Sequence, residues 1–380
     1  MQAEPSGKGG LVQTGSRIID FAMNKIISLS SIFDTKYAPA KTRQERLKRT
    51  KLIGYVAVLR SGAIGAFASA IPILILYQLI LVQYPHLDAE KNDVVGWNYI
   101  YLISAIIFVS LIATILELLL LYYDAIRAAG KMNQVTRRDV LAESEVDEAI
   151  QSALPLGLTK AALGMNRDRS PRFGINPMEK SSKTAVAAKG AAYRAQVILI
   201  NAMIKRILRR ILARMFGRTV PRAFLEWILL PIYVIWNMVG TTSVMNELIC
   251  RANGSEATKG VLDEIGIDHT MSQPLSVHVK NAIQHHVHGA KAIHPNIELI
   301  ILAMKFEECE FSPHPPPLNS LSEVEQQQLA KFILTLPHLE TRRTQLHSEM
   351  QVITEEVFSK SERKQWIQST KAFIHRGIDF

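Results

Sequence analysis

The sequence predicts an all-α integral membrane protein, built from a hairpin of two transmembrane helices and a helical cytoplasmic domain. Residues 61–84 contain no charged side chain, and residues 97–123 contain one, Glu117. Both runs exceed the ~20 residues that a helix needs to cross the ~30 Å hydrocarbon core of a bilayer. The rest of the chain shows helical periodicity, without the strand alternation and glycine-rich phosphate loops of α/β enzymes.

Changes in composition divide the 380 residues into five regions. In chain order they are an N-terminal amphipathic helix with a basic flank (1–50), the transmembrane hairpin (51–130), a basic linker (131–194), a basic amphipathic helix followed by a third apolar helix (195–250), and a soluble helical domain (251–380). The soluble region shows apolar residues at helical spacing, which is typical of a helix with one face in a core.

The distribution of charge predicts the orientation of the hairpin. The net charge is +10, and basic residues gather before the first span and after the second, whereas the loop 85–96 is acidic. Lysine and arginine are retained on the cytoplasmic side of a membrane. We therefore expect a multi-pass protein of a bacterial inner membrane with both termini cytoplasmic. The basic flanks contain Lys41, Arg43, Arg46, Lys48, Arg49 and Lys51, then Arg127, Lys131, Arg137 and Arg138.

Small residues line one face of the first span. Gly62, Ala66 and Ala70 recur at every fourth position, and Gly65 belongs to a neighbouring row. Small side chains let helix backbones approach closely in lipid. We expect this face to pack against the second span, or against the same helix of another subunit in a homo-oligomer. Glu117 lies near the cytoplasmic end of the second span, where it either pairs with a basic residue or serves an ion pathway.

The segment 195–218 carries dense positive charge on an amphipathic helical pattern. Apolar residues cover one face, and basic residues lie on the other: Lys205, Arg206, Arg209, Arg210 and Arg214. Such a helix is suited to the membrane surface, with its arginines at anionic headgroups. An ordinary helix of a soluble domain, a calmodulin-type target and a nucleic-acid-binding helix share this pattern. No motif that reads bases accompanies it, so nucleic acid is not an expected partner.

Residues 227–245 form a third apolar run that only just has the length of a span. Pro231, Asn237 and Gly240 make it a poor lipid-facing helix. A third span that starts in the cytoplasm would carry the C-terminal domain outside. We favour a re-entrant helix, or a helix buried in the cytoplasmic domain, which keeps that domain inside. Asn237 then needs buried hydrogen-bond partners.

Six histidines lie between positions 269 and 294. His278 and His285 are two helical turns apart, and His285 and His288 could contact one metal ion. Their spacing matches no known zinc-ligand pattern. We expect solvent-facing histidines on a helix over residues 274–291, and no bound metal or cofactor.

Three functions remain open at this point. The favoured one is a non-enzymatic membrane-anchored scaffold or accessory subunit, whose helical domain binds a protein partner and whose anchor contacts a bilayer that includes anionic lipids. An oligomeric pore or transporter component is the alternative, since two spans are too few for a typical monomeric transporter. A membrane-bound metal-dependent enzyme, which would use the histidines, is the third.

Overall fold

A computed structural model describes residues 40–83, 97–136, 158, 161–162, 172–177, 222–306, 315–341 and 346–380. In these residues the fold is all-α, as predicted, and the one β feature is an isolated bridge between Arg172 and Ile175. The predicted N-terminal amphipathic helix and the basic helix at 195–218 lie outside the described residues. The α-helices are α2 (Arg43–Gln83), α3 (Trp97–Thr136), α6 (Arg222–Ala252), α7 (Gly254–Ile265), α8 (Gln273–Ala290), α9 (Pro295–Ala303), α10 (Glu323–Thr335), α11 (Ser348–Val357) and α12 (Lys360–Arg376).

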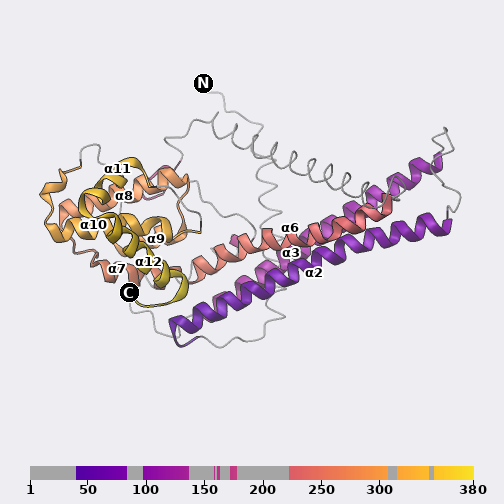
Figure 1. Ribbon diagram of the computed structural model, residues 1–380, viewed down its shortest axis with the longest axis horizontal. Helices are drawn as coiled ribbons and strands as arrows, with labels where there is room; N and C mark the ends of the chain where they lie inside the picture. The colour runs from indigo at the N-terminus through magenta and orange to yellow at the C-terminus, as the bar shows by residue number, and fades with distance from the viewer. Residues whose placement is uncertain are drawn as a thin grey trace, which may run out of the picture.

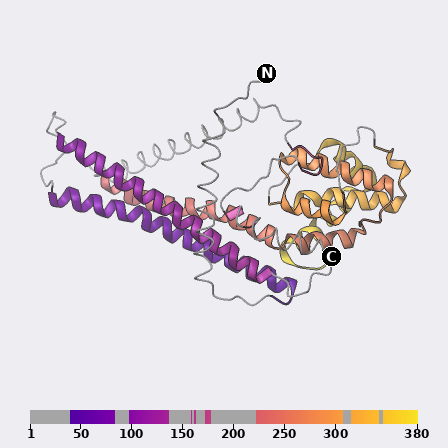
Figure 2. The ribbon, with the colours of Figure 1, turned by 180° about the vertical axis from the view of Figure 1, so that it is seen from behind.

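Helices α2, α3 and α6 lie side by side in a long bundle that extends away from a compact C-terminal domain (Figure 1, and from behind in Figure 2). α2 runs antiparallel to α6, because Thr50 contacts Asn253 while Gly65 faces Asn237. α2 also runs antiparallel to α3, whose Asp124 pairs with Arg60 while Val135 O accepts a hydrogen bond from Ala40 N. α3 and α6 are therefore parallel.

The C-terminal domain consists of α7 to α12 around one apolar core. The helices pack by side chains that are almost completely inaccessible, among them Ile283, Ile297, Leu329 and Phe332. Capping boxes start α10 and α12: the Ser322 and Ser359 hydroxyls each accept from a backbone amide three residues on, and Glu325 and Glu362 accept in return from the serine amides. Caps of this kind satisfy amides that the first helical turn leaves unpaired.

The C-terminal domain docks onto the basic end of α2. The Arg43 guanidinium donates to Phe373 O (2.6 Å) and lies 3.4 Å from the centre of the Phe373 ring. Lys51 Nζ donates to His375 O (2.5 Å), so both cations contact the last turn of α12. Unpaired carbonyls give this turn partial negative charge. Residues of the predicted cytoplasmic flank thus also attach the domain to the bundle.

α6 runs in the opposite direction to the one assumed from the sequence for a third span. Its C-terminal end leads into α7 beside the basic end of α2, where Arg46 pairs with Glu256 (3.1 Å). The domain therefore shares an end of the bundle with the basic flanks, whether or not α6 crosses a membrane. Charge gave no direction for this run, because basic residues lie on both sides of it: Arg218, Arg222 and Arg251.

Candidate functional site

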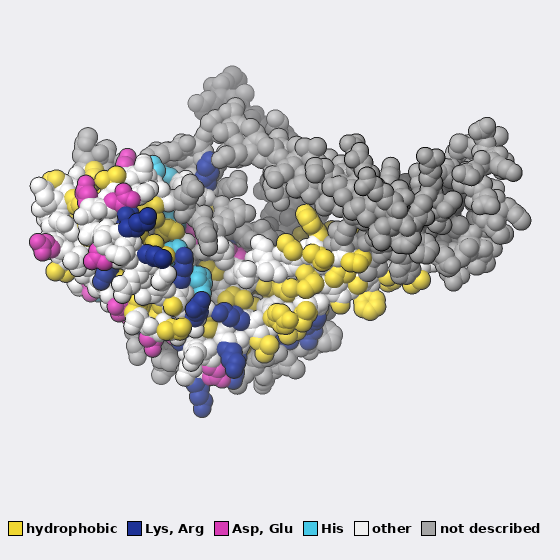
Figure 3. Space-filling model, viewed as in Figure 1, with side chains coloured by type: hydrophobic (Ala, Val, Ile, Leu, Met, Phe, Trp, Pro, Cys, Tyr) yellow, Lys and Arg dark blue, Asp and Glu magenta, His cyan; other side chains and the backbone are white. Residues whose placement is uncertain are grey.

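The outer surface of the three-helix bundle is apolar. Figure 3 shows hydrophobic side chains gathered along the described part of the bundle, whereas the C-terminal domain presents a mixed surface with many charges. Phe67 on α2, Phe108 on α3 and Val239 on α6 are 70%, 62% and 62% exposed. Large apolar surfaces on soluble proteins are rare and mark contacts with membranes or other proteins. Further exposed apolar residues are Leu59, Ile71, Leu74, Leu111, Ile115, Leu116, Leu118, Leu119, Leu120, Tyr233, Ile235 and Trp236.

Among the residues described, one stretch is long and apolar enough to cross a membrane, Arg43–Ile71 in α2. Core helices of soluble proteins can be equally long and apolar. A core helix is mostly buried, however, whereas 33% of the most apolar window of this stretch is buried. Exposure therefore separates this helix from the core helices of the C-terminal domain.

The small-residue face of α2 contacts α6. A methyl group at Gly65 would lie 2.3 Å from Asn237 Nδ2, and one at Gly62 would lie 3.0 Å from Met238 Cγ. Both glycines are buried, whereas Ala66 and Ala70 are half-buried. This face was expected to meet the second span or another subunit. The structure instead places Gly62 and Gly65 against the third apolar helix of the same chain.

A half-buried polar pair joins α6 to α3 in the apolar bundle. Asn237 Nδ2 on α6 donates to Glu117 Oε1 on α3 (2.5 Å), so within the described part of the chain the partner of Glu117 is an amide and not the basic residue considered from the sequence. The Ser61 hydroxyl of α2, donating to Val58 O (2.7 Å), lies 3.4 Å from Asn237 O. Buried polar groups in low dielectric are costly unless they are hydrogen-bonded. The pair fixes how α6 faces the other two helices.

The expectation of solvent-facing histidines is wrong. Helix α8 forms as expected, but His278, His285 and His286 are buried, as is His294 at the start of α9. Burial lowers the pKa of His278, although a hydrogen bond with the Pro316 backbone acts in the opposite direction. α8 packs against α10, and Glu349 of α11 lies beside His285, so that polar residues of α8 also face protein. Histidine can be accommodated there because buried carboxylates pair with it: His286 Nε2 lies 2.9 Å from Glu340 Oε1.

One group of described residues has the composition of a metal site: His285, His347 and Glu349, whose ligand atoms all lie within 4.8 Å of one another. His285 Nε2 is 3.3 Å from Glu349 Oε2, and its ring is 4.8 Å from that of His347. His285 is buried, whereas the other two are exposed. Of the three histidines considered from the sequence, only His285 belongs to this group, and His278 and His288 do not.

A buried ionic cluster at the junction between α6 and the C-terminal domain was missed in the sequence. Glu247 Oε1 accepts from Arg251 Nε (2.8 Å) and contacts His294 Nε2 (3.1 Å), and Glu247 Oε2 accepts from the Thr341 hydroxyl. His294 Nδ1 accepts from Asn296 N, so the Nε2 atom carries the proton that faces Glu247. Only the spacing of Glu247 and Arg251, one helical turn apart, is a signal of it.

Burial raises the pKa of Glu247, but the hydrogen bond from His294, the charge of Arg251 and the hydrogen bond from the Thr341 hydroxyl outweigh it. The pKa falls from 4.5 to about 2. The carboxylate is therefore held charged inside the junction. The cluster is a structural joint. It fixes α6 to His294 at the start of α9 and to Thr341, which lies shortly after η2 (Leu336–His338).

The predicted lipid-binding residues Lys205, Arg206, Arg209, Arg210 and Arg214 lie outside the described residues. Comparison of this chain with protein-family models, with curated proteins and with solved structures found no match.

Proposed function

We propose that this chain is an integral membrane protein whose α2, α3 and α6 lie in the bilayer, and whose C-terminal domain is a partner-binding scaffold or accessory subunit at the cytoplasmic face. The observation that carries the proposal is the contrast between two parts of one chain. The bundle turns large apolar side chains outward, whereas the C-terminal domain buries its own in a core. Water disfavours the first arrangement and lipid favours it.

The cytoplasmic placement rests on charge and on attachment. The first apolar run begins after Arg60 and the second ends before Asp124, and the basic flanks lie beyond these two residues. The C-terminal domain is attached to the same flank through Arg43, Arg46 and Lys51. The positive-inside rule then places flank, domain and both termini in the cytoplasm, which for a bacterial chain means the inner membrane. Because α3 and α6 are parallel, this proposal requires the chain between Thr136 and Arg222 to pass once more from the cytoplasmic side to the other side.

The scaffold role is supported by the rigid attachment of a helical domain to its anchor. A domain fixed by ionic contacts and by the buried Glu247 cluster presents its surface at a constant height above the membrane. Val324 at the start of α10 and Val352 in α11 are large apolar residues exposed on this domain, 66% and 52% accessible. We propose that such positions contact the protein partner.

Two experiments test the proposal. After expression of the full chain, membranes washed with alkaline carbonate should retain it, and release into the supernatant would contradict the membrane placement. A photo-crosslinking side chain placed at Val324 or Val352 should give a discrete heavier species in intact membranes. The same side chain at Ser361 on α12 serves as a comparison position, and equal diffuse crosslinking at all three would contradict the scaffold role.

A further inference from the structure

Of the three helix pairs in the bundle, α3 and α6 make the fewest contacts with each other. Each of them packs mainly along α2, and the hydrogen bond from Asn237 Nδ2 of α6 to Glu117 Oε1 of α3 (2.5 Å) joins them where they meet. Both side chains are half-buried, so this polar pair is accessible from the surroundings of the bundle. We call these two residues, together with Gly240 of α6, the α3–α6 seam.

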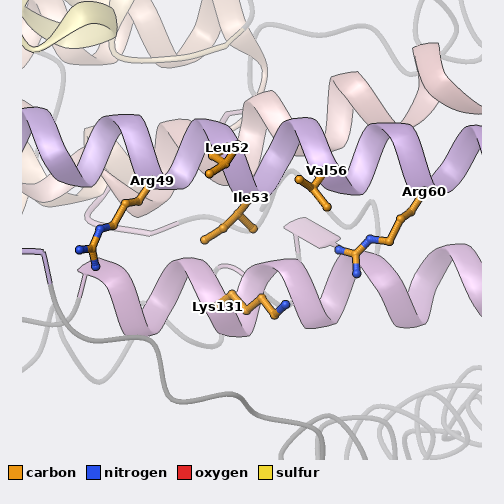
Figure 4. A pocket seen from close by; sticks show the side chains of 6 residues that line it. All are labelled: Arg49, Leu52, Ile53, Val56, Arg60 and Lys131. Atoms are coloured by element: carbon orange, nitrogen blue, oxygen red, sulfur yellow. The ribbon is translucent and has the colours of Figure 1, made fainter.

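The negative charge of Glu117 has no cation to balance it within the described part of the chain. Its partner there is the Asn237 amide, which donates a hydrogen bond but carries no charge. In the pocket that α2 and α3 line, Arg60 reaches from α2 toward α3 (Figure 4), and its guanidinium pairs with Asp124 (3.2 Å). Asp124 lies seven residues after Glu117, about 10 Å along α3. A carboxylate at the depth of an apolar run is costly in lipid unless a cation pairs with it.

The side of α6 that carries Gly240 has room for another helix. Met238 and Val234 lie on the side of α6 that faces α2, because a methyl group at Gly62 would contact both. At about 100° per residue, Met238 lies to one side of Asn237 and Gly240 to the other. Gly240 is exposed, and no described residue lies within 4 Å of the position of a Cβ there. A second helix backbone can therefore come close to α6 beside the polar pair.

Large apolar side chains lie next to the seam. Leu120, about one helical turn after Glu117, is 51% exposed, and Tyr233, about one turn before Asn237, is 49% exposed. A small cation or a water-soluble protein would lose its hydration to reach Glu117 among these side chains. An apolar helix with one basic residue meets both requirements, because it spans the bilayer itself and brings a cation to the depth of Glu117.

We propose that the α3–α6 seam is the binding site for a transmembrane helix of the partner, which carries a lysine or arginine at the depth of Glu117. The basic side chain pairs with the Glu117 carboxylate, which keeps its hydrogen bond from Asn237, and the partner backbone approaches α6 at Gly240. The inference rests on the proposed membrane placement and on the role as an accessory subunit. It names the class of partner, a membrane protein with a basic residue in an otherwise apolar span.

The test uses the full chain in neutral phosphatidylcholine vesicles, with synthetic transmembrane peptides of leucine and alanine as probes. One peptide carries a single lysine seven residues from an end of its apolar run, and the matched peptide has leucine there. Energy transfer between a dye on the C-terminal domain and a dye on the peptide measures binding. The lysine peptide should bind about tenfold more tightly, the ratio expected for one polar contact between helices in lipid.

Glu117→Gln is the decisive variant, because its amide oxygen can still accept from Asn237 and so preserves the fold. It should bind the two peptides equally. Glu355→Gln, the same change at an exposed glutamate of the C-terminal domain, should keep the preference of the unchanged chain. Glu117→Lys should reverse the preference, toward a peptide with glutamate in place of the lysine. Gly240→Leu should weaken binding of the lysine peptide without lowering the unfolding temperature of the chain.

Equal binding of the two peptides to the unchanged chain would overturn the site, and labelling of Glu117 by a lipid-soluble carbodiimide would then show that a proton neutralises the carboxylate. Binding of neither peptide would show that the chain itself fills the seam, which overturns the site as well. A preference that survives Glu117→Gln would mean that the attraction does not come from the seam.

Carbonate extraction and crosslinking separate this site from the proposed function. If the unchanged chain is released from membranes, the membrane placement fails. If the chain is retained and crosslinks discretely from Val324 or Val352, but shows no preference for the lysine peptide, only the seam site fails.

Discussion

Asn237 on α6 donates a hydrogen bond to the Glu117 carboxylate on α3, and the same side chain fills the space left by Gly65 on α2. One residue therefore connects all three helices of the bundle. In a low-dielectric bundle this is the point where polar chemistry fixes the rotation of each helix. Asn237, which weakened the third apolar run as a lipid-facing helix, thus has a clear structural role.

The first prediction concerns this pair. Asn237→Ala should destabilise the bundle by roughly 1–3 kcal/mol, because it leaves the Glu117 carboxylate without its amide partner. Glu117→Leu combined with Asn237→Leu should cost less than the sum of the two single changes. A double-mutant cycle of unfolding free energies in detergent measures the coupling. Additive effects would mean that the two side chains do not interact in the folded chain.

The second prediction concerns the close contact of α2 with α6. Gly65→Leu should lower the stability of the purified chain by about 1–3 kcal/mol or more, because a Cβ there already overlaps Asn237. Gly240→Leu on α6 is the matched control, since nothing lies within 4 Å of a Cβ at that exposed position. Thermal unfolding and crosslinking are measured on both. A lower crosslinked oligomer fraction with unchanged unfolding temperature would assign Gly65 to a contact between subunits instead.

The third prediction follows from the pKa of Glu247, which is about 2 in the folded chain and near 4.5 for an ordinary glutamate. The stabilisation by a carboxylate with a lowered pKa is complete above pH 4.5 and is lost as the pH falls toward 2. A difference of this size is worth roughly 3 kcal/mol. Urea unfolding of the full chain, followed by near-ultraviolet circular dichroism, should show this loss of stability as the pH falls.

Glu247→Gln should flatten that dependence and lower stability at neutral pH. Glu355→Gln, which changes an exposed glutamate paired with Arg363, should leave the dependence nearly as it is. An unchanged acid profile in Glu247→Gln would mean that this junction does not control the acid stability of the domain.

The fourth prediction is that the full chain, purified without chelator, holds no stoichiometric zinc. His285, His347 and Glu349 supply three ligands of two types that zinc accepts, but two of these residues are exposed and a separation of up to 4.8 Å is wider than a bound ion requires. Elemental analysis measures the metal content. One tightly bound ion that is lost in His285→Ala with His347→Ala would favour the metal-dependent alternative.

The all-α class and the apolar helices could be predicted from the sequence because length and hydrophobicity are local properties. The direction of α6 could not be predicted, because basic residues lie on both sides of the apolar run and therefore indicate no orientation. The partner of Gly65 was missed for a related reason, since a small-residue face shows that a helix approaches but not which one. The buried histidines were missed because the residues that cover α8 lie far away in the chain: α10 packs against it, and Glu340 and Glu349 pair with its histidines.

The central claim is that the bundle lies in a membrane with the C-terminal domain at its basic, cytoplasmic end. Two-sided cysteine labelling tests it most directly, with single cysteines at Lys91 in the acidic loop, at Arg222 and at Ser361. Cys309 is replaced by serine, and native Cys250 can stay, because burial raises the pKa of its thiol and keeps it unreactive.

In intact cells, a membrane-impermeant maleimide should label Lys91→Cys and Arg222→Cys, since α3 and α6 are parallel and α6 begins at the end where α3 begins. Ser361→Cys should be labelled only after the membrane is permeabilised. Labelling of Ser361→Cys in intact cells, or equal labelling of all three positions in the soluble fraction, would contradict the account.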